Sequence, residues 1–121
     1  MKHLIVSLKT PDEILQNFKE AYKAARHKKI KASHYEVSFD NKKGFDRFVH
    51  NLHILKYVLF FKPKSIYELA RITQMDVSNL NKVIIFFEEI GAITVQTKKV
   101  SGRIVKKPVV NYDTIEFRLA A

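Results

Sequence analysis

The stretch SIYELARITQMDVSNLNKVIIFFEEIG, residues 65–91, decides the fold, because it holds two helix patterns separated by a short turn. Ser65 and Glu68 form a capping-box pattern, and the helix that follows is expected to end near Thr73. Asp76 or Ser78 starts the second helix, and Gly91 stands where a helix usually ends in a left-handed residue. In both segments the apolar residues recur at helical spacing: Ile66, Leu69, Ala70, Ile72, Leu80, Val83, Ile84, Phe87 and Ile90.

A third helix is expected to precede this pair. From Phe45 the apolar positions follow a period near 3.6 residues until Pro63 interrupts them, which predicts one amphipathic core helix. Ahead of it, residues 1–44 read as a strand, a helix and a second strand. The expected bounds are His3–Leu8, Thr10–Arg26 with Thr10 as the cap and Pro11 in the first turn, and Ser33–Phe39, with a basic cluster at His27–Lys31 and a turn at Asp40–Gly44.

After Gly91 the period changes from that of a helix to that of a strand. Ala92–Gln96 and Ile104–Tyr112 are rich in β-branched residues and alternate, and Ser101-Gly102 supplies turn chemistry for a hairpin with a long tip. Thr114–Leu119 predicts one more strand. The fold class expected from this order of elements is α+β.

Composition narrows the class of protein. The chain has 121 residues, which corresponds to one domain, and 46% of them are apolar with 3 Gly and 3 Pro, which argues against disorder. It has no Cys, which excludes disulfides, thiolate metal sites and cysteine nucleophiles. Neither a membrane span nor a secretory signal is apparent, so we expect a cytoplasmic location.

Positive charge is concentrated at the two ends. Lys and Arg number 22 against 12 Asp and Glu, a net charge of +10. Residues 1–44 carry +5, residues 45–91 carry +1 and residues 92–121 carry +4. One explanation of this excess is that the positive charge only keeps the protein in solution. The other is that the two ends of the chain bind an anionic polymer.

Three helices followed by a basic hairpin is the order of a winged helix-turn-helix, in which the third helix enters the major groove of DNA. We therefore expect residues 76–90 to form the recognition helix and residues 94–110 the wing. Ser78, Asn79, Asn81 and Lys82 provide a polar face whose side chains can bond base edges or phosphates, although a solvated helix face would have the same composition.

The expected wing is strongly cationic. Five residues, Lys98, Lys99, Arg103, Lys106 and Lys107, lie at and beside its tip, where they can meet phosphates or the minor groove. Protection of sheet edges by charge could explain two or three of them without DNA. Ser65, at the start of the preceding helix, completes the predicted DNA-binding set.

At this point the chain resembles the small prokaryotic MarR-like winged helix-turn-helix transcriptional regulators, some of which are antitoxins. The resemblance rests on Phe18–Ala25, Ser65–Arg71, Asp76–Lys82, Glu89–Ile93 and Tyr112–Ile115. It implies a sequence-specific regulator of double-stranded DNA, acting as a repressor and usually dimeric. The sequence departs from the pattern at Met75, where Arg is common, and at Val83, where Asp is common, and these changes leave the operator sequence open.

A winged helix is complete without residues 1–44, so we divide the chain into an arm of residues 1–44 that holds a homodimer and a DNA-binding domain of residues 45–121. An antitoxin that neutralises a cognate toxin and represses its own operon is the alternative function. RNA binding and a small metal-dependent nuclease are weaker alternatives. We expect no enzyme, no cofactor and no metal, since His50 and His53 lack a third ligand at matching spacing.

Overall fold

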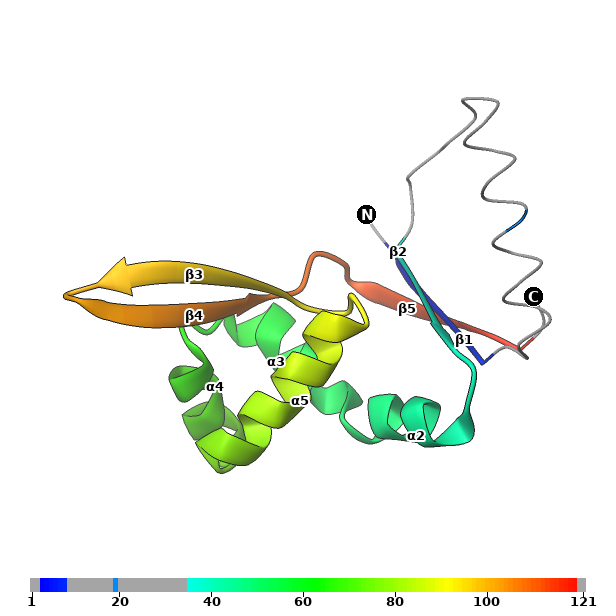
Figure 1. Ribbon diagram of the computed structural model, residues 1–121, viewed down its shortest axis with the longest axis horizontal. Helices are drawn as coiled ribbons and strands as arrows, with labels where there is room; N and C mark the ends of the chain where they lie inside the picture. The colour runs from blue at the N-terminus through cyan, green and yellow to red at the C-terminus, as the bar shows by residue number, and fades with distance from the viewer. Residues whose placement is uncertain (1–2, 9–18, 20–34, 120–121) are drawn as a thin grey trace, which may run out of the picture.

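The computed structural model describes residues 3–8, 19 and 35–119, and Figure 1 shows their arrangement. Strands and helices are mixed rather than alternating, so the chain is an α+β protein. The elements in chain order are β1 His3–Leu8, β2 Tyr35–Phe39, α2 Lys42–His50, α3 Leu52–Phe61, α4 Ile66–Thr73, α5 Val77–Glu89, β3 Thr94–Val100, β4 Arg103–Val109 and β5 Thr114–Arg118. The expected helix Thr10–Arg26, apart from Lys19, and the basic cluster His27–Lys31 lie outside the described residues.

The strands form two separate sheets. In the first, β1 lies between β2 and β5 and is parallel to both. The second is the antiparallel hairpin of β3 and β4, which extends away from the helices at the left of Figure 1. Because β5 belongs to the same sheet as β1 and β2, the three-stranded sheet unites strands from both sides of the expected boundary at residues 44 and 45.

One hydrophobic core joins this sheet to the helices. On the sheet face with Leu4, Val6 and Val37 the side chains are almost fully buried, and alternation puts Ile115 and Phe117 of β5 on the same face. The helices contribute Phe48, Ile54, Leu55, Val58, Leu69, Leu80, Ile84 and Phe87. Phe48 of α2 links the layers, since its ring lies 5.7 Å from the rings of both Phe39 and Phe87.

The expected single helix from Phe45 to Pro63 is wrong: the structure has two helices, α2 and α3, that meet at Asn51. The side-chain amide of Asn51 donates to the carbonyl oxygen of Arg47 at 2.9 Å, and its backbone N–H donates to the carbonyl oxygen of Phe48 at 3.2 Å. Asn competes well for such local bonds, which favours a helix end. The first helix also begins earlier than expected, at Lys42, because Asn41 caps it by accepting from the Gly44 N–H at 2.7 Å.

The helix pair of residues 65–91 forms as predicted. The Ser65 hydroxyl accepts from the Glu68 N–H at 3.0 Å, and Asp76 caps α5 by accepting from the Asn79 N–H at 3.2 Å. Between the helices Gln74 takes a left-handed conformation, so the turn is short. Gly91, with φ at +85°, ends the second helix as expected.

The hairpin differs from the sequence expectation in the length of its tip. Its strands are paired from Thr94 and Val109 out to Val100 and Arg103, so the loop has two residues. Ser101 (φ 50°) and Gly102 (φ 80°) both have positive φ, as in a type I′ turn, whose twist matches that of paired strands. The basic segment expected at a loose tip is therefore held in a regular ladder.

None of the helices in the described part of the chain is both long and apolar enough to cross a bilayer.

Candidate nucleic-acid interface

The exposed face of α5 is the first half of the candidate site. Ser78, Lys82, Ile85 and Glu89 follow one another at spacings of three and four residues, and all four are exposed. The opposite face, with Leu80, Ile84 and Phe87, is buried in the core. The amino-terminal half of the exposed face is thus polar and cationic, whereas Glu88 and Glu89 make the carboxyl-terminal end acidic.

The four residues predicted on α5 are not equivalent. Ser78, Asn79 and Lys82 are exposed, but Asn81 is half-buried and turns toward the hairpin. It lines a groove of about 210 Å³ together with Ile85 and Glu88 of α5, Thr97 of β3, Lys106 of β4 and other residues. The structure therefore brings Asn81 and Lys106 to one groove between helix and hairpin.

The hairpin register separates the five predicted cations into two sets. Residues paired directly across an antiparallel ladder point to the same face, and successive residues alternate. The face that borders α5, here called the groove face, carries Val95, Thr97, Lys99, Ile104, Lys106 and Pro108. The outer face carries Lys98, Arg103 and Lys107. Lys99 and Lys106 thus point to the α5 side, and the other three cations point away from it.

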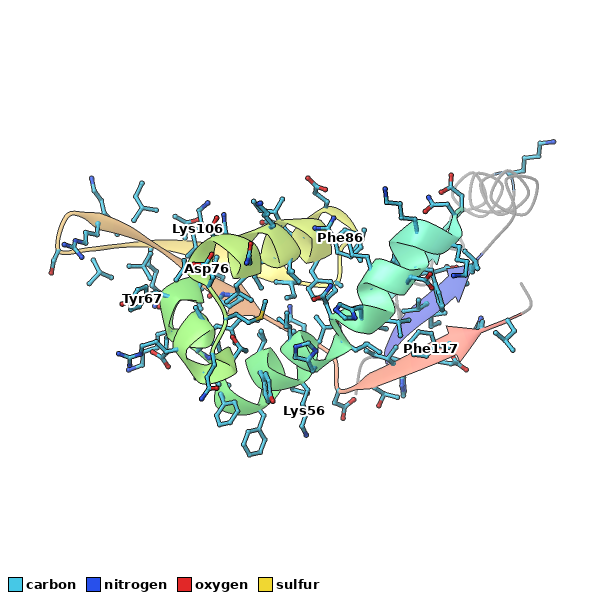
Figure 2. All side chains as sticks on the ribbon, turned by 90° about the horizontal axis from the view of Figure 1, so that it is seen from below. Lys56, Tyr67, Asp76, Phe86, Lys106 and Phe117 are labelled. Carbon is cyan, nitrogen blue, oxygen red and sulfur yellow. The ribbon has the colours of Figure 1, made fainter. Side chains whose placement is uncertain are left out.

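These cations form no ion pair in the described part of the chain, although Glu88 of α5 lines the same groove as Lys106. Among the described residues the ion pairs are Lys42–Asp46 and Glu116–Arg118, and neither involves α5 or the hairpin. The groove face therefore presents its positive charge to solvent. Figure 2 shows Lys106 on the hairpin beside the helix pair.

Ser65 has a structural task in the fold. It is half-buried at the start of α4, and its hydroxyl oxygen is the cap of that helix. Contact of Ser65 with DNA stays a prediction.

One exposed apolar residue, Ile85, was missing from the sequence-predicted site. It is 42% exposed on the face that also carries Lys82, and it lines the groove with Asn81 and Lys106. For Ile85 the signal was its spacing of seven residues from Ser78, which puts it on the outer face of α5.

The hairpin is anchored at its base by Tyr112. Its hydroxyl donates to the Ala92 carbonyl oxygen at 2.6 Å, which joins the segment before β3 to the segment after β4. Burial raises the pKa of this phenol well above its usual range. Tyr112 is therefore held as a neutral donor.

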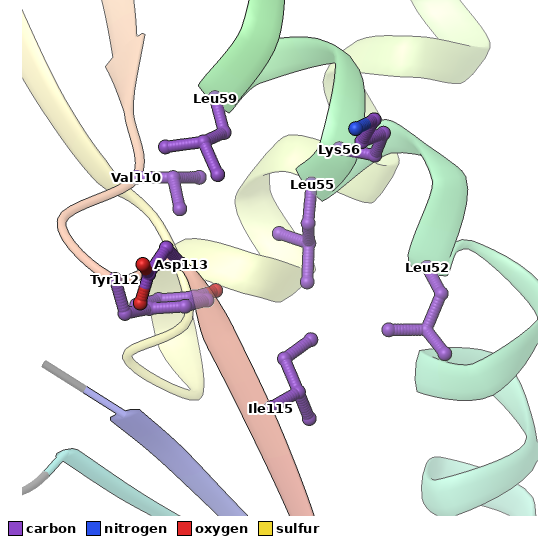
Figure 3. Close-up of a pocket in the computed structure, with 8 residues that line it drawn as sticks. All are labelled: Leu52, Leu55, Lys56, Leu59, Val110, Tyr112, Asp113 and Ile115. Atoms are coloured by element: carbon purple, nitrogen blue, oxygen red, sulfur yellow. The ribbon is translucent and has the colours of Figure 1, made fainter. Parts of the chain in front are cut away.

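A second pocket, of about 240 Å³, is lined in part by Tyr112 (Figure 3). Leu52, Leu55 and Leu59 of α3 face Val110, Tyr112 and Ile115 across it, and Lys56 and Asp113 also line it. It is separate from the groove between α5 and the hairpin, because the two share no lining residue.

The fold and the groove define an α+β protein in which a capped helix pair and a basic hairpin border one surface. A family model, HVO_A0114, matches residues 49–117, and the chain therefore belongs to the HVO_A0114 family. The matched segment runs from the end of α2 to β5 and includes all ten predicted site residues. No curated protein and no solved structure matches the chain.

Proposed function

We propose that the chain is a winged helix-turn-helix regulator of transcription that binds double-stranded DNA and represses its target. The observation that carries this proposal is the shared groove: Asn81 of α5 and Lys106 of the hairpin border one concave surface, and Lys82 and Lys99 are exposed on the same two elements. A surface of this kind offers amide and cationic donors to a polyanion and holds them on two rigid elements.

Each element has a distinct role in this proposal. The exposed amino-terminal half of α5 enters the major groove, which is wide enough for a helix. Ser78, Asn79 and Lys82 then reach base edges or nearby phosphates, and Ile85 can contact a thymine methyl group. Glu88 also lines the groove, so in this proposal the phosphates contact Lys106 and the amino-terminal half of α5 rather than the acidic end with Glu88 and Glu89.

The hairpin supplies affinity rather than sequence preference. Lys99 and Lys106 of the groove face neutralise phosphates and release counterions, which strengthens binding to every sequence. Asn81 connects the two contributions, because it lies on the reading helix and borders the hairpin. The likeness to MarR-like regulators and the net charge of +10 support the same class of ligand.

The experiment is a selection of binding sequences from random duplexes with the full chain, followed by titrations of the selected duplex at several salt concentrations. Lys99→Ala and Lys106→Ala should each flatten the slope of log affinity against log salt by about one unit and weaken all sequences alike. Lys98→Ala and Lys107→Ala are matched controls, because they remove the same charge from the outer face, and they should change the slope less.

Base reading is tested with the same duplexes. Asn79→Ala and Asn81→Ala should relax the preference at particular base pairs, each by about 1 to 3 kcal/mol, and leave the salt slope unchanged. Failure of the selection to enrich any sequence, or four lysine variants with equal effects, would contradict the proposal.

A further inference from the structure

The edge strand β5 has a pattern of charged and apolar residues that is complementary to a second, antiparallel copy of the same strand. It lies at one edge of the three-stranded sheet, and Thr114, Glu116, Phe117 and Arg118 are all exposed. An exposed edge presents unpaired backbone N–H and C=O groups to another strand. Figure 2 shows β5 along one border of the described part of the molecule, with Phe117 near its middle.

The two faces of this strand differ sharply. Ile115, Phe117 and the following Leu119 point to the helix-bearing face of the sheet, where Phe117 packs against Phe45 and is still 42% exposed. Leu119 is 98% exposed. On the other face the strand carries Glu116 and Arg118, which are both about half exposed and form an ion pair with each other at 3.3 Å.

We propose that β5 is the interface with a second copy of this chain, and that two β5 strands pair antiparallel across a two-fold axis at Phe117. Such an axis runs perpendicular to the sheet, so each side chain stays on its own face in the joined six-stranded sheet. The helices of both copies then lie on the same side of that sheet.

Charge selects this register over its neighbours. With the axis at Phe117, Glu116 of each copy faces Arg118 of the other, and two ion pairs of opposite charge form across the interface. An axis at Glu116 would set two carboxylates opposite each other, and an axis at Arg118 would set two guanidinium groups opposite each other. Like charges directly opposite on a sheet are destabilising. An axis at Ile115 would leave Arg118 opposite Tyr112, outside the strand.

The same register also matches the apolar residues. Leu119 of the second copy comes to lie opposite Ile115, and the two Phe117 side chains lie opposite each other at the axis. A continuous apolar stripe forms on the helix-bearing face, and it covers side chains that one copy alone leaves in water. The proposal concerns the association of the chain with itself and does not depend on DNA binding.

Charge reversal tests the register. Arg118→Glu or Glu116→Arg alone should weaken dimerisation of the full chain about tenfold or more in sedimentation, because each creates two like-charge contacts. The double variant, with both residues exchanged, should restore dimerisation to nearly the original value. Arg71→Glu is the matched control, since it makes the same change of charge at an exposed position of α4, away from β5. It should leave dimerisation unaltered.

Disulfide trapping gives an independent test, because the chain has no Cys of its own. Phe117→Cys should form a covalent dimer under mild oxidation. Thr114→Cys should not, because in this register it lies about 20 Å from its own copy. A chain that is monomeric at micromolar concentration, or a dimer that ignores both charge reversals and does not cross-link at residue 117, would overturn the proposal, whatever the outcome of the DNA titrations.

Discussion

At the scale of single residues, Tyr112 combines deep burial with a long-range hydrogen bond. It is 7% exposed, and its hydroxyl meets the carbonyl oxygen of Ala92 at 2.6 Å, twenty residues earlier in the chain. A buried carbonyl that loses its donor has no water to replace it. Sequence patterns indicated a strand through Tyr112 but not this bond, because its partner is brought near only by the complete hairpin.

Replacing Tyr112 by Phe should lower the free energy of unfolding by about 1 to 3 kcal/mol, since the Ala92 carbonyl would be left unpaired. Chemical denaturation monitored by circular dichroism measures the change. Tyr67→Phe is the matched control, because its hydroxyl is removed from a residue that is 64% exposed. Equal effects of the two substitutions would contradict the assigned role.

The same phenol predicts a dependence of stability on pH. Burial raises the pKa of Tyr112 in the folded chain, so above about pH 10 the unfolded chain releases this proton and the folded chain keeps it. The unfolded state then binds fewer protons, and the free energy of unfolding falls as pH rises, by at most about 1.4 kcal/mol per pH unit from this group. Below that pH the contribution is constant.

Denaturation of the wild type and of Tyr112→Phe at a series of alkaline pH values measures this contribution. The variant should lose stability less steeply above about pH 10. Identical slopes would show that this phenol does not titrate differently in the two states.

At the scale of elements, the sequence predicted helix ends that depend on neighbouring residues, but not features that depend on residues far apart in the chain. The caps at Ser65 and Asp76 and the left-handed Gly91 could be predicted, because each depends on residues within four positions. The break at Asn51 could not, because the apolar period of residues 45–62 continues across it. The division of the hairpin cations into two faces required the register, which depends on where the turn lies.

The hairpin turn gives a prediction at this scale. In a type I′ turn Asn is favoured over Ser at the first central position, so Ser101→Asn should stabilise the chain by about 0.5 kcal/mol. Gly102→Ala should destabilise it by about 1 kcal/mol, because φ is 80° there, a conformation that strains an alanine. The added Cβ would make no packing contact that offsets this strain. Thermal unfolding measures both, and effects of the same sign would argue against this turn.

At the scale of the whole molecule, the described residues share a hydrophobic core that extends from Leu4 to Tyr112. An arm of residues 1–44 that holds a homodimer was expected from the order of elements, since a winged helix needs no additional strand. The partnership of β1 with β5 joins the two parts in one sheet, and no local pattern announces a pairing between residues more than a hundred positions apart.

This shared core predicts a single cooperative unfolding transition. Leu4→Ala should lower the free energy of unfolding by about 2 to 5 kcal/mol, because Leu4 is completely buried. The loss should be the same by far-ultraviolet circular dichroism and by amide exchange in α5. Leu8→Ala, in the same strand but 43% exposed, is the control and should cost much less. Two separate transitions would indicate two independent units.

The central position of β1 has a consequence for synthesis of the chain. Its six residues leave the ribosome long before those of its second neighbour, β5, which ends at Arg118. Until then one side of an apolar strand has no partner, while the helix pair and the hairpin can already assemble from contacts close in sequence. Because β5 is made after β1 and β2, it completes their sheet, and a nascent chain halted before β5 would expose the edge of β1 and should be a substrate for chaperones.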